Sequence, residues 1–170
     1  MAGKHVLIAG ASGLVGYAAV KHFSAQPGVR VTAISRRAPF ALDRLGIRFF
    51  SANLSDETQC AALFGSMHDV THVVYAALHE QPGLIAGWRE QEQIATNDRM
   101  LRHLLAPLIR AARRLQHVSL LQGTKAYGAH VRRIDLPARE GRSDARDVPN
   151  FYWNQEDYLK ECQRGAYQRS

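Results

Sequence analysis

The run His5-Val6-Leu7-Ile8-Ala9-Gly10-Ala11-Ser12-Gly13-Leu14-Val15-Gly16 decides how the whole sequence is interpreted. Its first part, residues 5–9, is a short apolar run of the kind that forms a strand buried on both faces of a sheet. Glycines follow with the spacing G-x-x-G-x-x-G, and residues 14–25 then place apolar side chains at helical spacing. We therefore expect a strand, a glycine turn and a helix in immediate succession.

Each glycine of the turn has a structural reason in that setting. Gly10 permits a tight turn, Gly13 lets the backbone approach a pyrophosphate, and Gly16 allows the helix to pack closely on the strand. The free N–H groups and the positive dipole end of the helix attract phosphate oxygens. An ordinary glycine-rich turn is the alternative interpretation. The residues expected to bind a dinucleotide here are Gly10, Ser12, Gly13, Leu14, Val15 and Gly16.

Strand-like and helical stretches alternate along the rest of the chain. Further strands are expected at residues 29–34, 47–50, 71–76 and 117–121. Helices are expected at residues 55–66 with Ser55 as N-cap, at 88–114 and from 149–150 to about Arg164, with a long polar loop at 129–149. This alternation predicts an α/β fold, a Rossmann-type doubly wound parallel sheet with the strand order 3-2-1-4-5.

The composition is that of an ordinary globular protein. The 170 residues, 46% hydrophobic and 22% charged, suit one dinucleotide-binding domain over residues 1–165 and a polar tail at 166–170. No apolar run approaches the ~20 residues that cross a bilayer, and the N-terminal residues contain no secretory h-region. Two cysteines, Cys60 and Cys162, cannot form a disulfide framework, so we expect reduced thiols and a cytoplasmic location.

The formal net charge of +7 raises the question of nucleic-acid binding. No Lys/Arg tract is interleaved with aromatic residues, as a single-strand platform would require, so nucleic acid is not an expected partner. His68 and His72 have i, i+4 spacing but straddle a loop and a strand, and they therefore predict no metal site.

The end of the second strand indicates which dinucleotide is bound. An NAD-preferring site places Asp or Glu about 20 residues after the glycines, where the carboxylate accepts a hydrogen bond from the ribose 2′-hydroxyl. This sequence has Ser35-Arg36-Arg37 there. Arginine makes charge-assisted, often bidentate hydrogen bonds with phosphate, so these residues favour NADP(H), with solvent-facing loop charges as the alternative.

The glycine spacing resembles that of the extended short-chain dehydrogenase/reductases. In that superfamily Asp-Leu or Asp-Val often lies against the adenine where this chain has Asn53-Leu54, and small residues close to the cofactor match Ala76-Ala77. Asn97 lies in the helix where such enzymes often carry an asparagine, although a surface helical asparagine explains it equally well.

These reductases usually carry Tyr-x-x-x-Lys on one face of a helix. The literal match here, Tyr17-x-x-x-Lys21, lies on the first helix, and we interpret it as a chance match. At the expected place Tyr152 is followed by Glu156, which cannot supply the positive charge that stabilises a phenolate. The lysine must then come from elsewhere, and Lys125, in the loop leaving the fifth strand, is the candidate.

Residues 121–128 and 150–157 resemble motifs of the progesterone 5β-reductase/iridoid synthase-like family. Its members are atypical extended short-chain reductases that reduce activated carbon–carbon double bonds with NADPH. The resemblance implies that Lys125 and Tyr152 are the catalytic pair and that an enone or a related carbonyl compound is the substrate. In these roles the Tyr152 hydroxyl stabilises the enolate oxygen, and the Lys125 ammonium biases the phenol toward its charged form. The resemblance also implies that Ser35, Arg36 and Arg37 contact the 2′-phosphate.

Two departures from that family leave the substrate open. The Lys125 loop is one residue shorter than in the plant members, and Trp153 stands where a second tyrosine is common. Because the chain ends close to the Tyr152 helix, we expect the N-terminal half of such an enzyme, without the later strands and the substrate lobe. An exposed apolar patch on that helix would then favour a homodimer. A nucleotide-binding remnant without turnover and an NAD-dependent epimerase/dehydratase-like protein are the alternatives.

Overall fold

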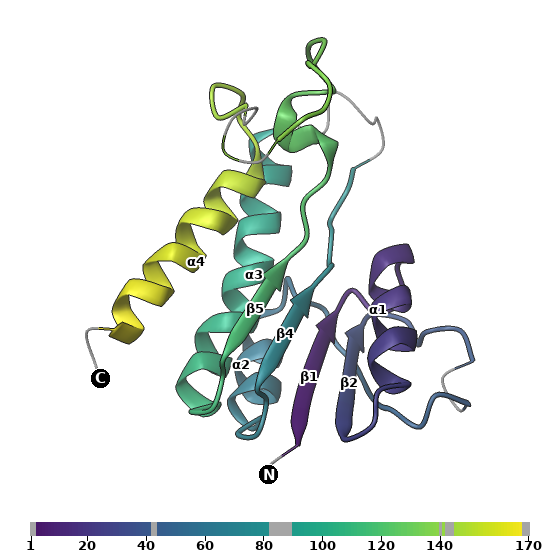
Figure 1. Cartoon of the computed structure of the whole chain (residues 1–170). Helices are drawn as coiled ribbons and strands as arrows, with labels where there is room; N and C mark the ends of the chain where they lie inside the picture. Colours follow the sequence, from purple (N-terminus) through teal and green to yellow (C-terminus); the bar gives the residue numbers. More distant parts are fainter. Residues whose placement is uncertain (1–2, 42–43, 82–89, 140, 142–144, 168–170) are drawn as a thin grey trace. The chain divides into compact units, whose positions relative to one another are not determined.

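The structure is a computed structural model that describes residues 3–41, 44–81, 90–139, 141 and 145–167 (Figure 1). The chain divides into two compact units, one formed by Met1–Leu78 and Met100–Leu121, the other by His79–Arg99 and Gln122–Ser170. The elements in chain order are β1 (Lys4–Ala9), α1 (Leu14–Ser24), β2 (Val29–Ser35), β3 (Arg48–Ser51), α2 (Glu57–Gly65), β4 (His72–Tyr75), α3 (Gln91–Ala111), β5 (His117–Leu120), the short 3₁₀ helix η3 (Thr124–Tyr127) and α4 (Phe151–Tyr167).

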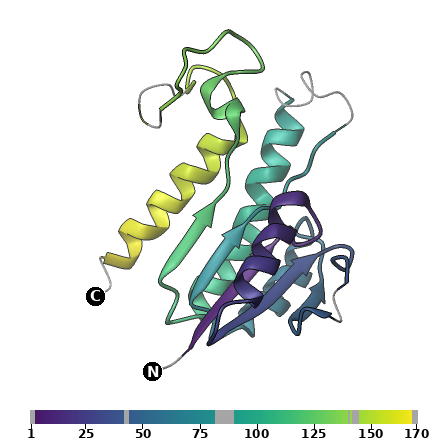
Figure 2. The ribbon, with the colours of Figure 1, turned by 45° about the vertical axis from the view of Figure 1, so that its right-hand side comes forward.

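The first unit contains a five-stranded sheet in which every strand pair is parallel (Figures 1 and 2). The strand order is β3-β2-β1-β4-β5, which confirms the order predicted from the sequence. β1 lies at the centre, and its last residue, Ala9, is in register with Ile34 of β2 and Tyr75 of β4. The carboxyl ends of these strands therefore meet at one edge of the sheet.

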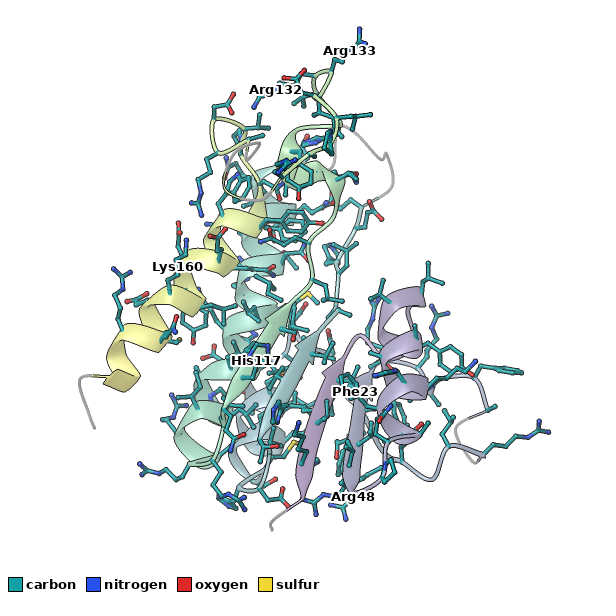
Figure 3. All side chains as sticks on the ribbon, in the orientation of Figure 1. Phe23, Arg48, His117, Arg132, Arg133 and Lys160 are labelled. Atoms are coloured by element: carbon teal, nitrogen blue, oxygen red, sulfur yellow. The ribbon has the colours of Figure 1, made fainter. Side chains whose placement is uncertain are left out.

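Apolar side chains cover both faces of this sheet. On one face, Val6 and Ile8 of β1 pack with Val20 of α1, and Phe23 of α1 packs against the same cluster (Figure 3). α2 and the part of α3 in this unit lie on the opposite face (Figure 2). That part of α3 carries a stripe of completely buried leucines at helical spacing. The leucines of the stripe are Leu101, Leu104, Leu105 and Leu108.

The N-cap of α2 differs from the prediction. The carboxylate of Asp56 accepts a hydrogen bond from Gln59 N at 2.9 Å, so Asp56 is the N-cap and the helix begins at Glu57. Ser55, the predicted cap, lies one residue too early, and its N–H donates instead to Asn53 Oδ1 at 3.1 Å. Serine and aspartate cap helices almost equally well, and the sequence pattern therefore could not separate them.

The ends of the longer helices also differ from the predictions. α3 ends at Ala111 instead of residue 114, and it continues through Pro107. Residues 88 and 89 of that predicted helix lie outside the described residues. α4 ends at Tyr167, beyond the predicted end near Arg164. None of the helices in the described ranges is long and apolar enough to cross a membrane.

In the second unit, the segment before α4 is a loop, as predicted. Its described residues between Gly128 and Asn150 contain no helix or strand. Arg132 donates two hydrogen bonds to the Asp147 carboxylate, at 2.6 and 2.9 Å, and so ties the two ends of the loop together. No large apolar side chain is exposed on α4 over residues 151–165, so the apolar patch predicted there is not found. The homodimer expected from it stays a prediction.

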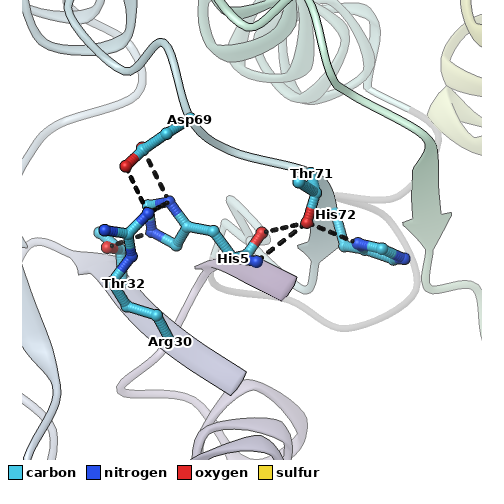
Figure 4. A network of polar contacts seen from close by, with 6 residues as sticks. All are labelled: His5, Arg30, Thr32, Asp69, Thr71 and His72. Carbon is cyan, nitrogen blue, oxygen red and sulfur yellow. Dashed lines mark hydrogen bonds and ion pairs between the residues drawn. The ribbon is translucent and has the colours of Figure 1, made fainter. Parts of the chain in front are cut away.

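A polar network joins the amino ends of the central strands (Figure 4). His5 Nδ1 lies 2.9 Å from Asp69 Oδ1, and His5 Nε2 lies 2.8 Å from Thr32 Oγ1. Arg30 donates a further hydrogen bond to Asp69. Thr71 Oγ1 accepts from His5 N at 2.9 Å and donates to His5 O at 3.1 Å. Burial, followed by the positive charge of Arg30, lowers the pKa of His5 below its ordinary value, so the ring is neutral at physiological pH.

We expect the Asp56→Ala substitution to lower the free energy of unfolding by about 1 kcal/mol, because it removes the side-chain acceptor of the α2 N-terminus. Ser55→Ala should change it by less than about 0.5 kcal/mol, since Ser55 contributes only its backbone N–H here. Urea denaturation of the two variants measures both values. A larger loss for Ser55→Ala than for Asp56→Ala would contradict the assignment of the cap.

We expect His5→Gln to reduce the dependence of stability on pH between about pH 7 and about pH 5. Since the pKa of His5 is lower in the folded than in the unfolded chain, the unfolded chain binds more protons as the pH falls. The contribution of neutral His5 is thus present above its unfolded pKa and lost below it. Urea denaturation across this range gives the slope, with the exposed His68 substituted by Gln as the control. Equal slopes for His5→Gln and the unsubstituted protein would rule this out.

Candidate functional site

The glycine turn of the first unit is held by backbone-to-backbone contacts. Gly10 has a φ of +81°, and a Cβ built there would lie 2.5 Å from Ala76 O and 2.6 Å from Ala77 N. A Cβ on Gly16 would lie 2.1 Å from Gly10 O, and one on Gly13 would lie 3.3 Å from the same oxygen. Gly10 and Gly16 therefore exclude any side chain, and Gly13 tolerates one only if the Gly10 carbonyl moves slightly.

The amino end of α1 is open. Its N-cap, Gly13, has no side chain to accept a hydrogen bond, and the first turn contains no acidic residue. Tyr17 N is the first amide of the helix to reach a backbone acceptor, Gly13 O, at 2.8 Å. The preceding N–H groups of Leu14, Val15 and Gly16 lack intrahelical partners by the geometry of any helix start. Ser12, Leu14 and Val15 are exposed, so the turn presents amides and a positive dipole end to solvent.

The other predicted cofactor residues of β3 and β4 lie at the same edge of the sheet. The half-buried Ala76 and Ala77 follow β4, and Ala76 N donates to Ala9 O at 2.9 Å. Asn53 follows β3 and is exposed, with its Oδ1 accepting from Ser55 N. Leu54 is only 5% exposed, and its carbonyl lies 3.0 Å from His103 Nδ1. The Leu54 side chain therefore belongs to the core.

The segment after β2 presents two guanidinium groups. Ser35 Oγ donates to Arg37 O at 2.6 Å, and Ser51 Oγ donates to Arg36 O at 3.1 Å, so both hydroxyls hold the backbone of this turn. The side chains of Arg36 and Arg37 are exposed, and no acidic residue in the described ranges forms an ion pair with either. Both are at the carboxyl edge that also carries the glycine turn, where a phosphate can meet them.

In the second unit, Tyr152 is the second residue of α4 and is fixed at both its backbone and its side chain. Asn150 Oδ1 accepts from Tyr152 N at 3.1 Å, and Asn150 Nδ2 donates to Lys125 O at 3.4 Å. The Tyr152 ring contacts Phe151 edge-to-face, with centroids 4.7 Å apart. It lies in a buried cluster, and the side chain is 8% exposed. The cluster consists of Ile94, Ala126, Phe151, Tyr152 and Trp153.

The hydroxyl of Tyr152 faces the turn that precedes Lys125. Its oxygen accepts a hydrogen bond from Gly123 N at 3.1 Å. Burial raises the pKa of Tyr152 above its ordinary value; the Gly123 N–H opposes this effect, whereas the negative charge of Glu80 adds to it. The phenol is therefore neutral at physiological pH. The structure thus brings the Tyr152 hydroxyl to the turn that precedes Lys125. The stabilisation of a phenolate by the Lys125 charge stays a prediction.

Lys125 forms an ion pair with Glu80, a residue that the sequence analysis did not predict as part of the site. Lys125 Nζ lies 3.5 Å from Glu80 Oε1; the Lys125 side chain is half-buried and that of Glu80 is exposed. Glu156, at the position usually held by lysine, pairs with Arg146 at 2.9 Å and with Lys160 at 2.5 Å. Glu156 therefore stabilises α4 and the preceding loop.

Buried amides hold the backbone on either side of Glu80. Asn97 Oδ1 accepts from His79 N at 2.9 Å, and Asn97 Nδ2 donates to His79 O at 2.8 Å. Gln93 Oε1 accepts from Gln81 N at 2.8 Å, and Gln155 Nε2 donates to Asn97 O at 2.8 Å. Asn97 is completely buried, so its interpretation as a surface asparagine is wrong. No sequence pattern predicted a role for Gln93 or Gln155, because each forms its hydrogen bond with a backbone atom that is distant in sequence.

Three further residues are Tyr17 and Lys21, the literal Tyr-x-x-x-Lys match, and Tyr127, a second tyrosine close to Lys125 in sequence. Tyr17 and Lys21 are on α1, in the first unit, where Lys21 Nζ lies 6.0 Å from the Tyr17 ring centroid. Tyr127 belongs to η3 and is half-buried. Within the described residues, no group of three or more His, Cys, Asp or Glu side chains is placed to hold a metal ion.

Comparison with protein families decides where this chain belongs. A model described as the NAD dependent epimerase/dehydratase family matches residues 6–150. The chain belongs to this family. The match covers the glycine turn, the sheet except the first two residues of β1, and the Lys125 turn, and it ends just before α4.

Similar curated proteins confirm the resemblance to iridoid synthase-like proteins. An (S)-8-oxocitronellyl enol synthase of Catharanthus roseus is 30% identical over 166 residues, which are 91% of this chain and 40% of the relative. A short chain dehydrogenase of Penicillium aethiopicum is 30% identical over 173 residues, which are 95% of this chain and 44% of the relative. The chain thus spans less than half the length of these relatives.

Solved structures confirm the fold. An ADP-L-glycero-D-manno-heptose-6-epimerase of Helicobacter pylori has a TM-score of 0.71 and 17% identity, over 94% of this chain and 51% of the other. A UDP-glucose 4-epimerase has a TM-score of 0.69 and 16% identity, over 98% of this chain and 48% of the other. At these identities the likeness shows the Rossmann-like fold alone.

We expect replacement of both Arg36 and Arg37 by Ala to weaken NADPH binding about tenfold or more, because a charge-assisted hydrogen bond contributes about 1.5–3 kcal/mol. NADH lacks the 2′-phosphate, so its affinity should change far less. Titration of each nucleotide, followed by intrinsic fluorescence, measures both affinities. Arg113→Ala, which removes an exposed arginine beyond the end of α3, is the matched control. Tighter binding of NADH than of NADPH by the unsubstituted protein would contradict the assignment.

Proposed function

We propose that the chain is an NADPH-dependent reductase of activated carbon–carbon double bonds, or the cofactor-binding part of one, with Tyr152 and Lys125 as its catalytic residues. The observation that carries the proposal is the neutral, buried Tyr152 phenol held against the Gly123–Lys125 turn, on a helix with glutamate where lysine is usual. The name of the Catharanthus roseus relative describes the formation of an enol. Hydride addition to the β-carbon of an enone gives an enolate, which agrees with that name.

The first unit fits the dinucleotide that this reaction needs. A Cβ at Gly10 or Gly16 would collide with backbone, so the turn keeps the open shape in which its amides can approach a pyrophosphate. The N–H groups of Leu14, Val15 and Gly16 would bind the phosphates, and Arg36 and Arg37 would bind the 2′-phosphate. When bound, NADPH supplies the hydride.

Tyr152 would act on the substrate carbonyl. As the β-carbon gains a hydride, negative charge develops on the carbonyl oxygen, and a neutral phenol can donate a hydrogen bond or its proton to that oxygen. The raised pKa keeps this proton on Tyr152 through the neutral pH range. After proton transfer, the Gly123 N–H already bonded to the Tyr152 oxygen would stabilise the phenolate. Lys125 would add positive charge from the same turn.

The same features argue against the epimerase or dehydratase alternative. A reaction that begins by oxidising an alcohol needs a base to accept the hydroxyl proton. Burial and Glu80 both raise the pKa of Tyr152, so little phenolate is available at neutral pH for that task. A reaction that begins with reduction needs the proton that Tyr152 retains.

We also propose a cytoplasmic location for the protein. Cys60 and Cys162 are both free thiols, as expected in a reducing compartment. Burial, with a smaller effect of Asp56, raises the pKa of Cys60 to about 11, so this thiol is protonated and unreactive at neutral pH.

We expect Tyr152→Phe to lower the turnover of a simple cyclic enone about 100-fold or more, since it removes the acid group, while NADPH affinity stays within about twofold. Oxidation of NADPH, followed at its absorbance maximum, measures turnover, and a fluorescence titration measures binding. Tyr127→Phe removes a hydroxyl from η3 in the same unit and should leave both unchanged. Tight NADPH binding without enone-dependent oxidation in the unsubstituted chain would favour the non-catalytic alternative. Full turnover by Tyr152→Phe would overturn the assigned role.

A further inference from the structure

We propose that Glu80 is a positioning residue of this site, whose carboxylate fixes the Lys125 ammonium beside the turn that binds the Tyr152 hydroxyl. The proposal deepens the function proposed above and rests on it for its catalytic meaning. Its structural part concerns only residues of the second unit. The ion pair itself is the first observation, with Lys125 Nζ 3.5 Å from Glu80 Oε1.

The second observation is the way in which the backbone around Glu80 is held. Asn97 pairs with both backbone polar groups of His79, and Gln93 binds the N–H of Gln81, so a side-chain amide fixes the residue on each side of Glu80. Asn97 and Gln93 are completely buried. The buried amide oxygens of Asn97 and Gln93 accept hydrogen bonds from this backbone, and moving the backbone would leave those oxygens unpaired. Glu80 therefore starts from a fixed backbone position, although the segment is not part of a helix or strand.

The third observation is that Lys125 is fixed from its other side. Asn150 Nδ2 donates to Lys125 O, and Asn150 Oδ1 caps the backbone of Tyr152. Gly123, two residues before Lys125, donates to the Tyr152 hydroxyl oxygen. Tyr152, the Gly123–Lys125 turn and Glu80 are thus linked to one another. Asn150 and Gly123 bind Tyr152 to the turn, and the ion pair binds Glu80 to Lys125.

Glu80 is an electrostatic partner of Tyr152. Segments of the second unit near Tyr152 carry charged or titratable side chains, and the negative charge of Glu80 raises the pKa of Tyr152. Glu156, on α4 itself, is engaged by Arg146 and Lys160. The charged or titratable side chains of the segments near Tyr152 are His79 and Glu80, then Glu92, Asp98 and Arg99 of α3, Lys125 and Tyr127 of η3, Arg146 and Asp147 of the loop, and Glu156 and Asp157 of α4.

We expect two substitutions to shift the pH at which Tyr152 ionises in opposite directions. Removal of the carboxylate in Glu80→Gln should lower the pH at which Tyr152 ionises, because a nearby negative charge disfavours the phenolate. Removal of the ammonium in Lys125→Met should raise that pH, because the Glu80 charge is then uncompensated. Glu80→Asp keeps the charge and should restore most of the original titration.

The test is a titration that needs neither cofactor nor turnover. The chain is labelled with 3-fluorotyrosine, whose phenol ionises at lower pH than that of tyrosine, and each phenol is followed by ¹⁹F NMR. The resonance missing in Tyr152→Phe assigns Tyr152. The matched control is Glu92→Gln, which removes an α3 carboxylate paired with Arg99 at 2.9 Å. A shift in Glu80→Gln no larger than in Glu92→Gln, together with no shift in Lys125→Met, would overturn the proposal.

Turnover provides the second readout and separates the two proposals. Activity that depends on protonated Tyr152 is lost as the pH rises through its pKa, so Glu80→Gln should move this alkaline loss to lower pH with NADPH affinity within about twofold of the unsubstituted chain. Shifted titrations without any enone reduction would sink the proposed function and keep the role of Glu80. If the chain reduces an enone but Glu80→Gln changes neither the Tyr152 titration nor the pH profile of turnover, the proposed function stands and the role of Glu80 is overturned. If Glu80→Gln fails to fold, the Lys125→Met and Glu80→Asp titrations decide the matter.

Discussion

The absence of side chains at Gly10 and Gly16 is the constraint on which the first unit depends. At Gly10 the backbone passes so close to Ala76 and Ala77 that a single added carbon would overlap them, and at Gly16 the helix meets the turn with the same closeness. The strand ends of β1 and β4 and the start of α1 can converge only because of this. The first amides of α1 have no side-chain cap to satisfy them. An edge with uncapped helical N–H groups thus follows from steric requirements at two residues.

Much of the fold was predictable because it depends on local patterns. The glycine spacing, the apolar runs and the helical periodicity gave all five strands in the correct order and the main helices. Errors occurred where several local solutions have nearly equal energy. Ser55 and Asp56 are both good caps, and the hydrogen bond to Gln59 N decides between them only in three dimensions. The end of α3 is another such case, since Arg113 and Arg114 continue a helix as readily as they leave one.

The candidate site was predictable only in part. Tyr152 and Lys125 were identified through motifs, and the structure holds them on adjoining turns of the second unit. Glu80, Gln93 and Gln155 were missed because their partners are 45, 12 and 58 residues away, mostly backbone atoms, and backbone partners leave no pattern in a single sequence. The raised pKa of Tyr152 could not be predicted for the same reason. Its pKa depends on burial and on Glu80, and neither is visible from the spacing between tyrosine and lysine.

The turn after β2 has a consequence for how coenzyme preference can evolve. Its backbone is tied by the hydroxyls of Ser35 and Ser51 to the carbonyls of Arg37 and Arg36, so its shape does not rely on either guanidinium. The two arginine side chains are consequently interchangeable with other residues at little structural cost. A descendant of this chain could acquire an acidic residue there, and with it an affinity for the unphosphorylated ribose, while the scaffold beneath remained the same.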